Sequence, residues 1–206
     1  MSAIKTPDYA VHFGSDGVPA LREVLQKGRF SNVFLLVDSN TARDCLPVLL
    51  QEVPEAAGWE VLTIPAGESH KQIETCMGVW KALSAKGADR SSLLVNLGGG
   101  VVTDLGGFVA STYMRGISFV NIPTSLLAMV DASVGGKTGV DLGTLKNQVG
   151  VINQPELVWV FPEFLDTLSP RETRSGFAEM LKHGLIRDAA YWERLCALSG
   201  PDRSEE

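Results

Sequence analysis

The stretch from Asp131 to Asn147, DASVGGKTGVDLGTLKN, concentrates residues that could do chemistry. Lys137 and Lys146 are cations that can hold an anionic substrate, and the glycines let the backbone turn sharply or approach a ligand closely. The apolar run IPTSLLAMV comes directly before the stretch and must be buried. Polar, glycine-rich sequence on a rigid apolar support is a common way to build a site, so the chain's chemistry is predicted to converge here.

The hexapeptide VGGKTG inside this stretch matches only part of a P-loop. A P-loop has the pattern G-x-x-x-x-G-K-[ST], and Asp131 stands where its first glycine is required. The hexapeptide is also expected to follow a helix, whereas a P-loop follows a strand. Hydrolysis of ATP or GTP by that route is therefore not expected.

A second candidate site is LGGGVVTDLGGFVA, which runs from Leu97 to Ala110. Three consecutive glycines follow an expected strand and precede an expected helix, an arrangement that points backbone N–H groups at an anion. Thr103 stands where a dinucleotide-binding fingerprint has glycine or alanine, so that fingerprint is incomplete. The triple glycine still predicts a site for a nucleotide diphosphate, because a simple turn needs only one or two glycines.

Strands and helices alternate through most of the chain and must position these stretches. A short strand, a turn and a helix from Pro19 are expected within residues 9–26. Further strands are expected at 32–37, 59–64, 92–97 and 118–122, and helices at 41–50 and 72–86. This alternation predicts an α/β fold with a doubly wound, largely parallel, Rossmann-like sheet.

Polar residues follow two of these strands. Asp38, Asn40, Glu68 and Lys71 fall at the carboxyl ends, where ligands of such sheets bind. The alternative is that Asp38 only caps the next helix and that Glu68 and Lys71 are ordinary charges at a helix start. The residues alone leave both interpretations open.

The pattern changes near residue 161. Short strands are expected at 150–152 and 157–161, followed by a helical segment at 171–198. We therefore predict an α/β domain over residues 1–161 and the start of an all-helical domain over 162–206. Glu179, Lys182 and His183 share one helix face, which is either solvated or part of a site. Gly176 and Gly184 favour a site, because glycine is a poor choice for an exposed helix.

Composition limits the class of partner. The 206 residues carry a net charge of −6 and a pI of about 5.1, which argues against nucleic acid or an acidic membrane surface. The three widely spaced cysteines indicate reduced thiols and not a disulfide framework. No signal peptide and no membrane span are recognised, so a cytoplasmic protein is expected.

Four blocks taken together, GGGVVTDLGGFVA, PTSLLAMVDASVGGKTGV, LKNQVG and GFAEMLKHG, closely resemble the 3-dehydroquinate synthase family. The resemblance covers nearly the whole chain. It implies an NAD-binding domain, a helical domain, and one divalent metal, zinc or cobalt, in the cleft between them. The implied enzyme is a homodimeric, phosphate-eliminating lyase of the shikimate pathway to chorismate and the aromatic amino acids. It converts 3-deoxy-D-arabino-heptulosonate 7-phosphate, a small phosphorylated sugar acid, to 3-dehydroquinate and phosphate, using NAD that is regenerated in each turnover.

The resemblance also assigns site residues. It gives Glu179 as a metal ligand and Arg115 as a phosphate contact in the partner subunit, and it places substrate and catalytic contacts at Asp131, Lys137, Lys146, Asn147 and Lys182. The matching NAD positions are Asp38, Asn40, Glu68, Lys71, Gly99, Gly100, Val101, Asp104, Thr124, Ser125, Lys137, Lys146, Phe164, Thr167, Leu168 and Glu172.

One departure from the family concerns the metal. The family completes its site with two histidines from the C-terminal domain, but this chain has only His12, His70 and His183, none at a matching position. His183 is interpreted as packing or as support for a ligand. The chain is therefore expected to be a truncated product or a fragment, which binds NAD weakly and turns over negligibly.

Two other functions remain as alternatives. A polyol or alcohol dehydrogenase of the same fold would release NADH, which a synthase would not. A non-catalytic nucleotide-binding module would be unaffected by Lys137→Ala or Glu179→Ala.

Overall fold

A seven-stranded sheet forms the centre of the computed structural model, which describes residues 3–198. The strand order is β1-β2-β9-β6-β5-β3-β4, and every neighbouring pair is parallel except β1 with β2. The strands of this sheet are β1 (Ala3–Lys5), β2 (Ala10–Phe13), β3 (Val33–Asp38), β4 (Glu60–Ile64), β5 (Leu93–Gly98), β6 (Ser118–Pro123) and β9 (Leu157–Val160).

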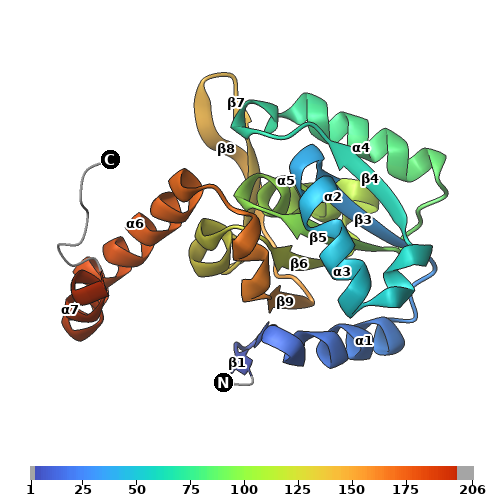
Figure 1. The fold of residues 1–206 in the computed structure, drawn as a ribbon. Coiled ribbons are helices and arrows are strands. Elements are labelled where there is room, and N and C mark those ends of the chain that lie inside the picture. The colour runs from blue at the N-terminus through green and yellow to red at the C-terminus, as the bar shows by residue number, and fades with distance from the viewer. Residues whose placement is uncertain (1–2, 199–206) are drawn as a thin grey trace.

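Helices cover both faces of the sheet (Figure 1). They are α1 (Gly17–Gly28), α2 (Ser39–Asp44), α3 (Leu46–Glu52), α4 (Ile73–Ala85) and α5 (Gly100–Thr112). Two further helices, α6 (Pro170–Arg187) and α7 (Ala189–Leu198), extend away from the sheet (Figure 1). The helix expected at 41–50 is divided at Cys45 into α2 and α3. Short 3-10 or π-helical segments connect several of these elements.

Alternating side chains of β3 show how the two layers form. Leu35 and Val37 join one apolar cluster with α1 and α3, whereas Phe34 and Leu36 join a second cluster with α4 and α5. All four side chains are fully buried, as expected for a parallel strand covered on both faces. The prediction of an α/β fold with a doubly wound, largely parallel sheet is confirmed.

The lysine- and glycine-rich stretch corrects one sequence expectation. It is not an isolated turn before a short strand at 150–152, but an antiparallel hairpin outside the main sheet, made of β7 (Lys137–Leu142) and β8 (Leu145–Ile152). Gly139 and Gly150 face each other across it, and a Cβ on Gly150 would lie 2.2 Å from the carbonyl oxygen of Thr138. The glycines therefore let the two backbones come close, a role that composition did not distinguish from ligand contact.

The C-terminal helical segment also differs from the expected single run, because it breaks at Asp188 between α6 and α7. Gly184 allows α7 to pack closely against α6, because a Cβ there would lie 2.9 Å from Trp192 Cα on α7. Gly176 is buried against Leu126, so α6 packs closely on the segment after β6. None of the helices in residues 3–198 is long and apolar enough to cross a membrane.

Candidate active site

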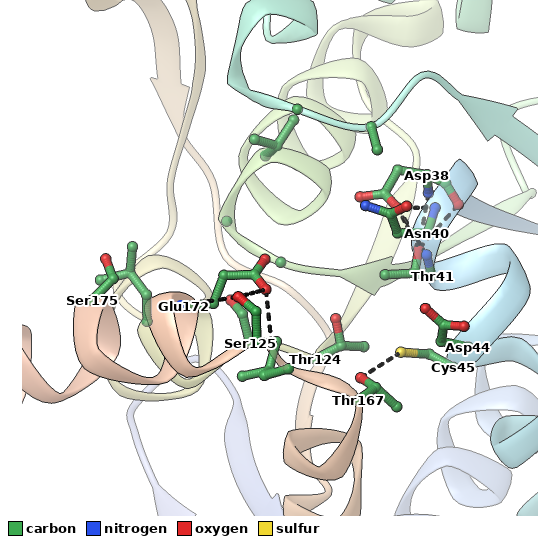
Figure 2. A pocket seen from close by; sticks show the side chains of 18 of the residues that line it. Asp38, Asn40, Thr41, Asp44, Cys45, Thr124, Ser125, Thr167, Glu172 and Ser175 are labelled. Carbon is green, nitrogen blue, oxygen red and sulfur yellow. Dashed lines mark hydrogen bonds between the residues drawn. The ribbon is translucent and has the colours of Figure 1, made fainter. Parts of the chain in front are cut away.

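A cavity of about 500 Å³ opens at the carboxyl ends of β3, β5 and β6, and we call it the strand-end cavity. Figure 2 shows Asp38 and Asn40 on one side of it and Glu172 on the other, with Thr124 and Ser125 between them. Most of the residues that the family resemblance assigns to NAD line it: Asp38, Asn40, Glu68, Gly99, Gly100, Val101, Thr124, Ser125, Thr167, Leu168 and Glu172.

Asp38 both caps a helix and lines this cavity. Its Oδ1 accepts hydrogen bonds from the backbone N–H groups of Asn40 at 2.9 Å and Thr41 at 2.8 Å. The Thr41 hydroxyl in turn accepts from the Asp38 N–H, which completes a capping box at the start of α2. The two interpretations left open by the sequence are thus compatible, since the cap holds the carboxylate at the cavity wall.

The glycine turn places the start of α5 at the cavity. Gly99 is the residue before the helix, and no side chain caps this end. A Cβ on Gly99 would lie 3.2 Å from Ser125 Oγ, and one on Gly100 would lie 3.4 Å from Ala132 Cβ. Thr103, which breaks the dinucleotide fingerprint, is buried and donates its hydroxyl to the carbonyl oxygens of Gly99 and Gly100. The turn therefore offers backbone donors without side-chain obstruction.

Charge in this cavity is predominantly negative. Asp38, Asp44, Glu68 and Glu172 line it, and its one lining cation, Arg43, is paired with Asp44 at 2.6 Å. The Arg43 side chain lowers the pKa of the Asp44 carboxyl, which stays ionised. A bound phosphate would therefore depend on the α5 backbone N–H groups and on the helix dipole.

A second cavity, of about 690 Å³, lies beside the β7–β8 hairpin, and we call it the hairpin cavity. Asp104, Asp131, Lys137 and Asn147 line it. Lys137 is exposed at the start of β7, and Asn147 has a left-handed backbone with φ of 53°. Asp131, Lys137 and Asn147 all belong to the stretch 131–147, whereas Asp104 comes from α5. The cavity therefore brings together residues from separate parts of the sequence.

Lys71 lies buried against two residues that line the hairpin cavity. Its Nζ contacts the Asp104 carboxylate and donates a hydrogen bond of 2.6 Å to Asn147 Oδ1. Burial raises the pKa of Asp104 to about 6, and the Lys71 charge offsets only part of that shift. An ion pair this deep is costly to break, because either partner alone would be an unpaired buried charge.

Two further contacts tie the hairpin to the segment after β4. The Asp141 N–H donates to the Lys71 carbonyl oxygen at 2.8 Å, and within the hairpin Asp141 Oδ1 accepts the backbone N–H of Asn147 at 2.8 Å. Lys146 pairs with Glu68 at 2.9 Å on the surface. Lys71 and Lys146, both assigned to NAD by resemblance, line neither cavity and instead connect the hairpin to the sheet body.

Glu179, on α6, meets residues that the sequence did not group with it as ligands. His183 Nε2 lies 3.2 Å from Glu179 Oε1 and 3.8 Å from Asp131 Oδ1. Lys182 Nζ also contacts Glu179 Oε1, which raises the pKa of that lysine. The ligand atoms of Asp131, Glu179 and His183 lie within 4.8 Å of one another. His183, expected to serve packing or support, thus stands in a cluster capable of binding a metal.

Some assigned residues lie elsewhere, and some lining residues were missed. Phe164 is fully buried and packs edge-on against Phe161, and Arg115 is exposed and lines neither cavity. The sequence reading missed Thr41, Cys45, Gly67 and Ser175, which also line the strand-end cavity. Thr41 and Cys45 stand one helical turn apart just after β3, a spacing that could have indicated their common direction.

Comparison with known proteins agrees with this architecture. The family described as 3-dehydroquinate synthase N-terminal matches residues 61–175. A 3-dehydroquinate synthase of Parabacteroides distasonis is 46% identical over 166 residues, which are 81% of this chain and 47% of that protein. The synthase of Gloeobacter violaceus is 40% identical over 98% of this chain and 57% of its own length. The chain thus spans about half the length of these curated relatives.

Solved structures share the same fold. A 2-epi-5-epi-valiolone synthase from Streptomyces hygroscopicus, with NAD+ and Zn2+ bound, aligns with a TM-score of 0.77 and 35% identity over 92% of this chain and 53% of that one. A 2-deoxy-scyllo-inosose synthase complexed with carbaglucose-6-phosphate, NAD+ and Co2+ aligns with a TM-score of 0.78 and 26% identity over 86% of this chain and 48% of that one. With the family match across more than half of its residues, the chain belongs to the 3-dehydroquinate synthase family.

Proposed function

We propose that this chain forms the NAD-binding part, and one wall of the substrate and metal cleft, of an enzyme that converts 3-deoxy-D-arabino-heptulosonate 7-phosphate to 3-dehydroquinate and phosphate. The proposal includes a homodimer in which Arg115 reaches the partner's phosphate site. Residues 1–161 would be the NAD domain, and residues from 162 onward the start of the helical domain. The family membership and the two adjoining cavities support it.

The strand-end cavity is the proposed NAD site. The free N–H groups at the start of α5 would receive the diphosphate, and the Asp38 carboxylate would receive ribose hydroxyls. The neighbouring structures with NAD+ bound support the choice of cofactor. When bound, NAD would supply oxidation of one ring hydroxyl and its later reduction, so that no net NADH is released.

The hairpin cavity is the proposed substrate site. Lys137 would hold an anionic group of the substrate, and Asn147 and Asp131 would orient its hydroxyls. Lys71 and Asp104 would fix Asn147 from behind through the 2.6 Å hydrogen bond to its Oδ1. Because the two cavities adjoin the same segment of α5, a substrate here would lie beside a bound dinucleotide.

Glu179 fits a divalent metal on an observation of this structure. Its Oε1 is buried, the Lys182 ammonium contacts it, and His183 Nε2 lies 3.2 Å away. A largely buried carboxylate that already faces a cation can hold a divalent ion in the same place once the exposed lysine side chain turns away. The metal would supply Lewis acidity toward substrate oxygens, with Glu179 among its ligands.

The observation that carries the proposal is the gathering of assigned NAD residues around the uncapped start of α5. Calorimetric titration of NAD into the purified chain tests it. Gly100→Val would place methyl groups in this turn and should weaken NAD binding by at least about a hundredfold, which is about 2.7 kcal/mol. Gly78→Val on α4 is the matched control, because a Cβ there meets open space. Equal NAD affinities in the two variants would overturn the proposed site.

A further inference from the structure

The β8 strand carries a bulge opposite Asp141. The ladder pairs that flank the bulge are Val140 with Val149 and Leu142 with Leu145. One residue of β7 therefore faces three residues of β8, 146–148, and Asn147 is the middle one. Its backbone is left-handed, with φ of 53°, and its side chain lines the hairpin cavity. A bulge interrupts the ladder and turns a side chain in a new direction, often beside a functional site.

Asp141 supplies the hydrogen bond that the interrupted ladder does not. Its Oδ1 accepts the Asn147 backbone N–H at 2.8 Å. A carboxylate is a stronger acceptor than the backbone carbonyl oxygen that a regular ladder would offer. Asn147 is one of the few residue types that tolerate the left-handed region, and the Asp141 side chain holds it there.

Asp141 also connects the bulge to Lys71, which closes a ring of three hydrogen bonds. The Asp141 N–H donates to the Lys71 carbonyl oxygen at 2.8 Å, and Asp141 forms a parallel bridge with Gln72. The Lys71 ammonium returns to the bulge, where it donates to Asn147 Oδ1 at 2.6 Å. Each of the three residues in the ring contacts the other two, so both the backbone and the side chain of Asn147 are held.

The Lys71 contact determines which end of the Asn147 amide faces the cavity. An ammonium carries donors only, so the amide atom that meets it must be the oxygen. The Lys71 ammonium is buried and also contacts Asp104, which keeps it in place. The amide N–H donors of Asn147 are therefore left for a ligand in the hairpin cavity, where Lys137 supplies a positive charge. Donors of this kind suit an oxygen anion such as a phosphate or a carboxylate.

We propose that Asp141 is a positioning residue of the hairpin cavity, which holds Asn147 in the bulge so that the Asn147 amide donates to an oxygen anion beside Lys137. Asp141 is not among the residues that line the cavity, and it acts through Asn147. The inference rests on the proposed function in treating this cavity as the substrate site. It adds the residue that fixes the orientation of the group that meets the substrate's anionic end.

The test is a titration of inorganic phosphate into the isotope-labelled full chain, followed by heteronuclear NMR of its amide groups. The side-chain amide signals of Asn147 are identified by their loss in Asn147→Ser, and phosphate should shift them in the wild type. Asp141→Asn and Asp141→Ala both remove the charge, but only asparagine keeps an oxygen that can accept the Asn147 N–H. Asp141→Ala should therefore bind phosphate at least about fivefold more weakly than Asp141→Asn.

Asn147→Asp tests the orientation of the amide without removing Asp141. It keeps the size of the side chain and an oxygen for Lys71, but it replaces the amide N–H donors with an oxygen that repels an anion. Phosphate binding should weaken by at least about tenfold, while the backbone amide signals of the hairpin stay in place. Asp8→Ala, at an exposed aspartate between β1 and β2, is the matched control and should bind phosphate as the wild type does.

Equal phosphate affinities of Asp141→Ala and Asp141→Asn would overturn the positioning role of Asp141. The donor role of the Asn147 amide would be overturned by an unshifted Asn147 signal in the wild type, or by an unchanged affinity in Asn147→Asp. A parallel NAD titration separates this inference from the proposed function. NAD binding without a phosphate shift at Asn147 overturns the inference and leaves the proposed NAD site, whereas a phosphate shift without NAD binding does the reverse.

Discussion

The two cavities are built in different ways, although they lie next to each other. The strand-end cavity lies at the ends of parallel strands whose central side chains are buried, so the core holds much of its wall in place. The hairpin cavity is made by β7 and β8, which lie outside the main sheet. The hairpin packs on α5 through Thr138 and Gly107, and it is tied to the β4–α4 segment mainly by polar contacts of Lys71, Asp141 and Lys146.

This difference indicates which substitutions should disturb each cavity. Geometry at the strand-end cavity depends on apolar packing that the whole sheet shares. Geometry at the hairpin cavity depends on the packing of Val140 in the second apolar cluster and on a few charged groups, of which one pair is buried. Substitutions in the buried pair, in the core and at the surface should therefore differ in their cost to stability.

Lys71→Met should have the largest effect on stability. The substitution leaves the Asp104 carboxylate in a buried position without its cation and removes the hydrogen bond to Asn147. Breaking a buried pair in this way costs about 3–5 kcal/mol. Urea unfolding of the variant and the wild type measures the loss. A decrease below about 1 kcal/mol, the range typical of exposed pairs, would show that the hairpin does not depend on the buried pair.

The pH dependence of the free energy of unfolding should reveal the raised pKa of the Asp104 carboxyl. Its pKa is raised from 3.8 to about 6 in the folded chain, so the folded state binds the proton more tightly than the unfolded state. Stability from this group is therefore greatest below about pH 4, falls as pH rises to about 6, and is level above that, with a total change of up to about 3 kcal/mol. In Asp104→Asn this fall should be absent. Urea unfolding between pH 4 and 8 tests it, and parallel curves for the two proteins would contradict the shifted pKa.

Gly106→Ala should test how much stability depends on the close packing of α5 against the central strands. A Cβ on Gly106 would lie 2.0 Å from Asn96 Oδ1, and Asn96 is held by a 2.9 Å hydrogen bond to Asn121. Overpacking at such a position costs about 1–3 kcal/mol. Thermal unfolding measures the cost. Gly78→Ala on the outer helix α4, where a Cβ meets open space, should instead be neutral or slightly stabilising.

Lys146→Met should have the smallest effect. Its pair with Glu68 is 2.9 Å long, but the two side chains are 69% and 47% exposed. Exposed pairs of this kind contribute about 0–1 kcal/mol. Chemical unfolding should therefore barely distinguish this variant from the wild type at moderate salt. A loss as large as that of Lys71→Met would mean that the surface contact, and not the buried pair, fixes the hairpin.

Much of the fold follows from local pattern. The alternation of apolar strands and helices predicted the doubly wound sheet, and the triple glycine predicted a helix start facing a cavity. Most of the residues assigned to NAD gather at the strand ends because parallel strands bring their carboxyl ends to one edge.

The hairpin and the cluster around Glu179 could not be predicted in the same way. Gly139 and Gly150 look like turn glycines in the sequence, and only strand pairing shows that they face each other. His183 and Asp131 are far apart in the chain, and their approach depends on the close contact of α6 with Leu126 and Leu127. Contacts between distant segments are set by tertiary packing, which a reading of local sequence does not contain.

A crystal structure of the full chain with NAD would test the proposed cofactor site directly. We expect the diphosphate within hydrogen-bonding distance of the Gly100 and Val101 N–H groups at the start of α5, and a ribose beside Asp38. A dinucleotide seated in the hairpin cavity, against Lys137 and Asn147, would contradict the assignment of the two cavities.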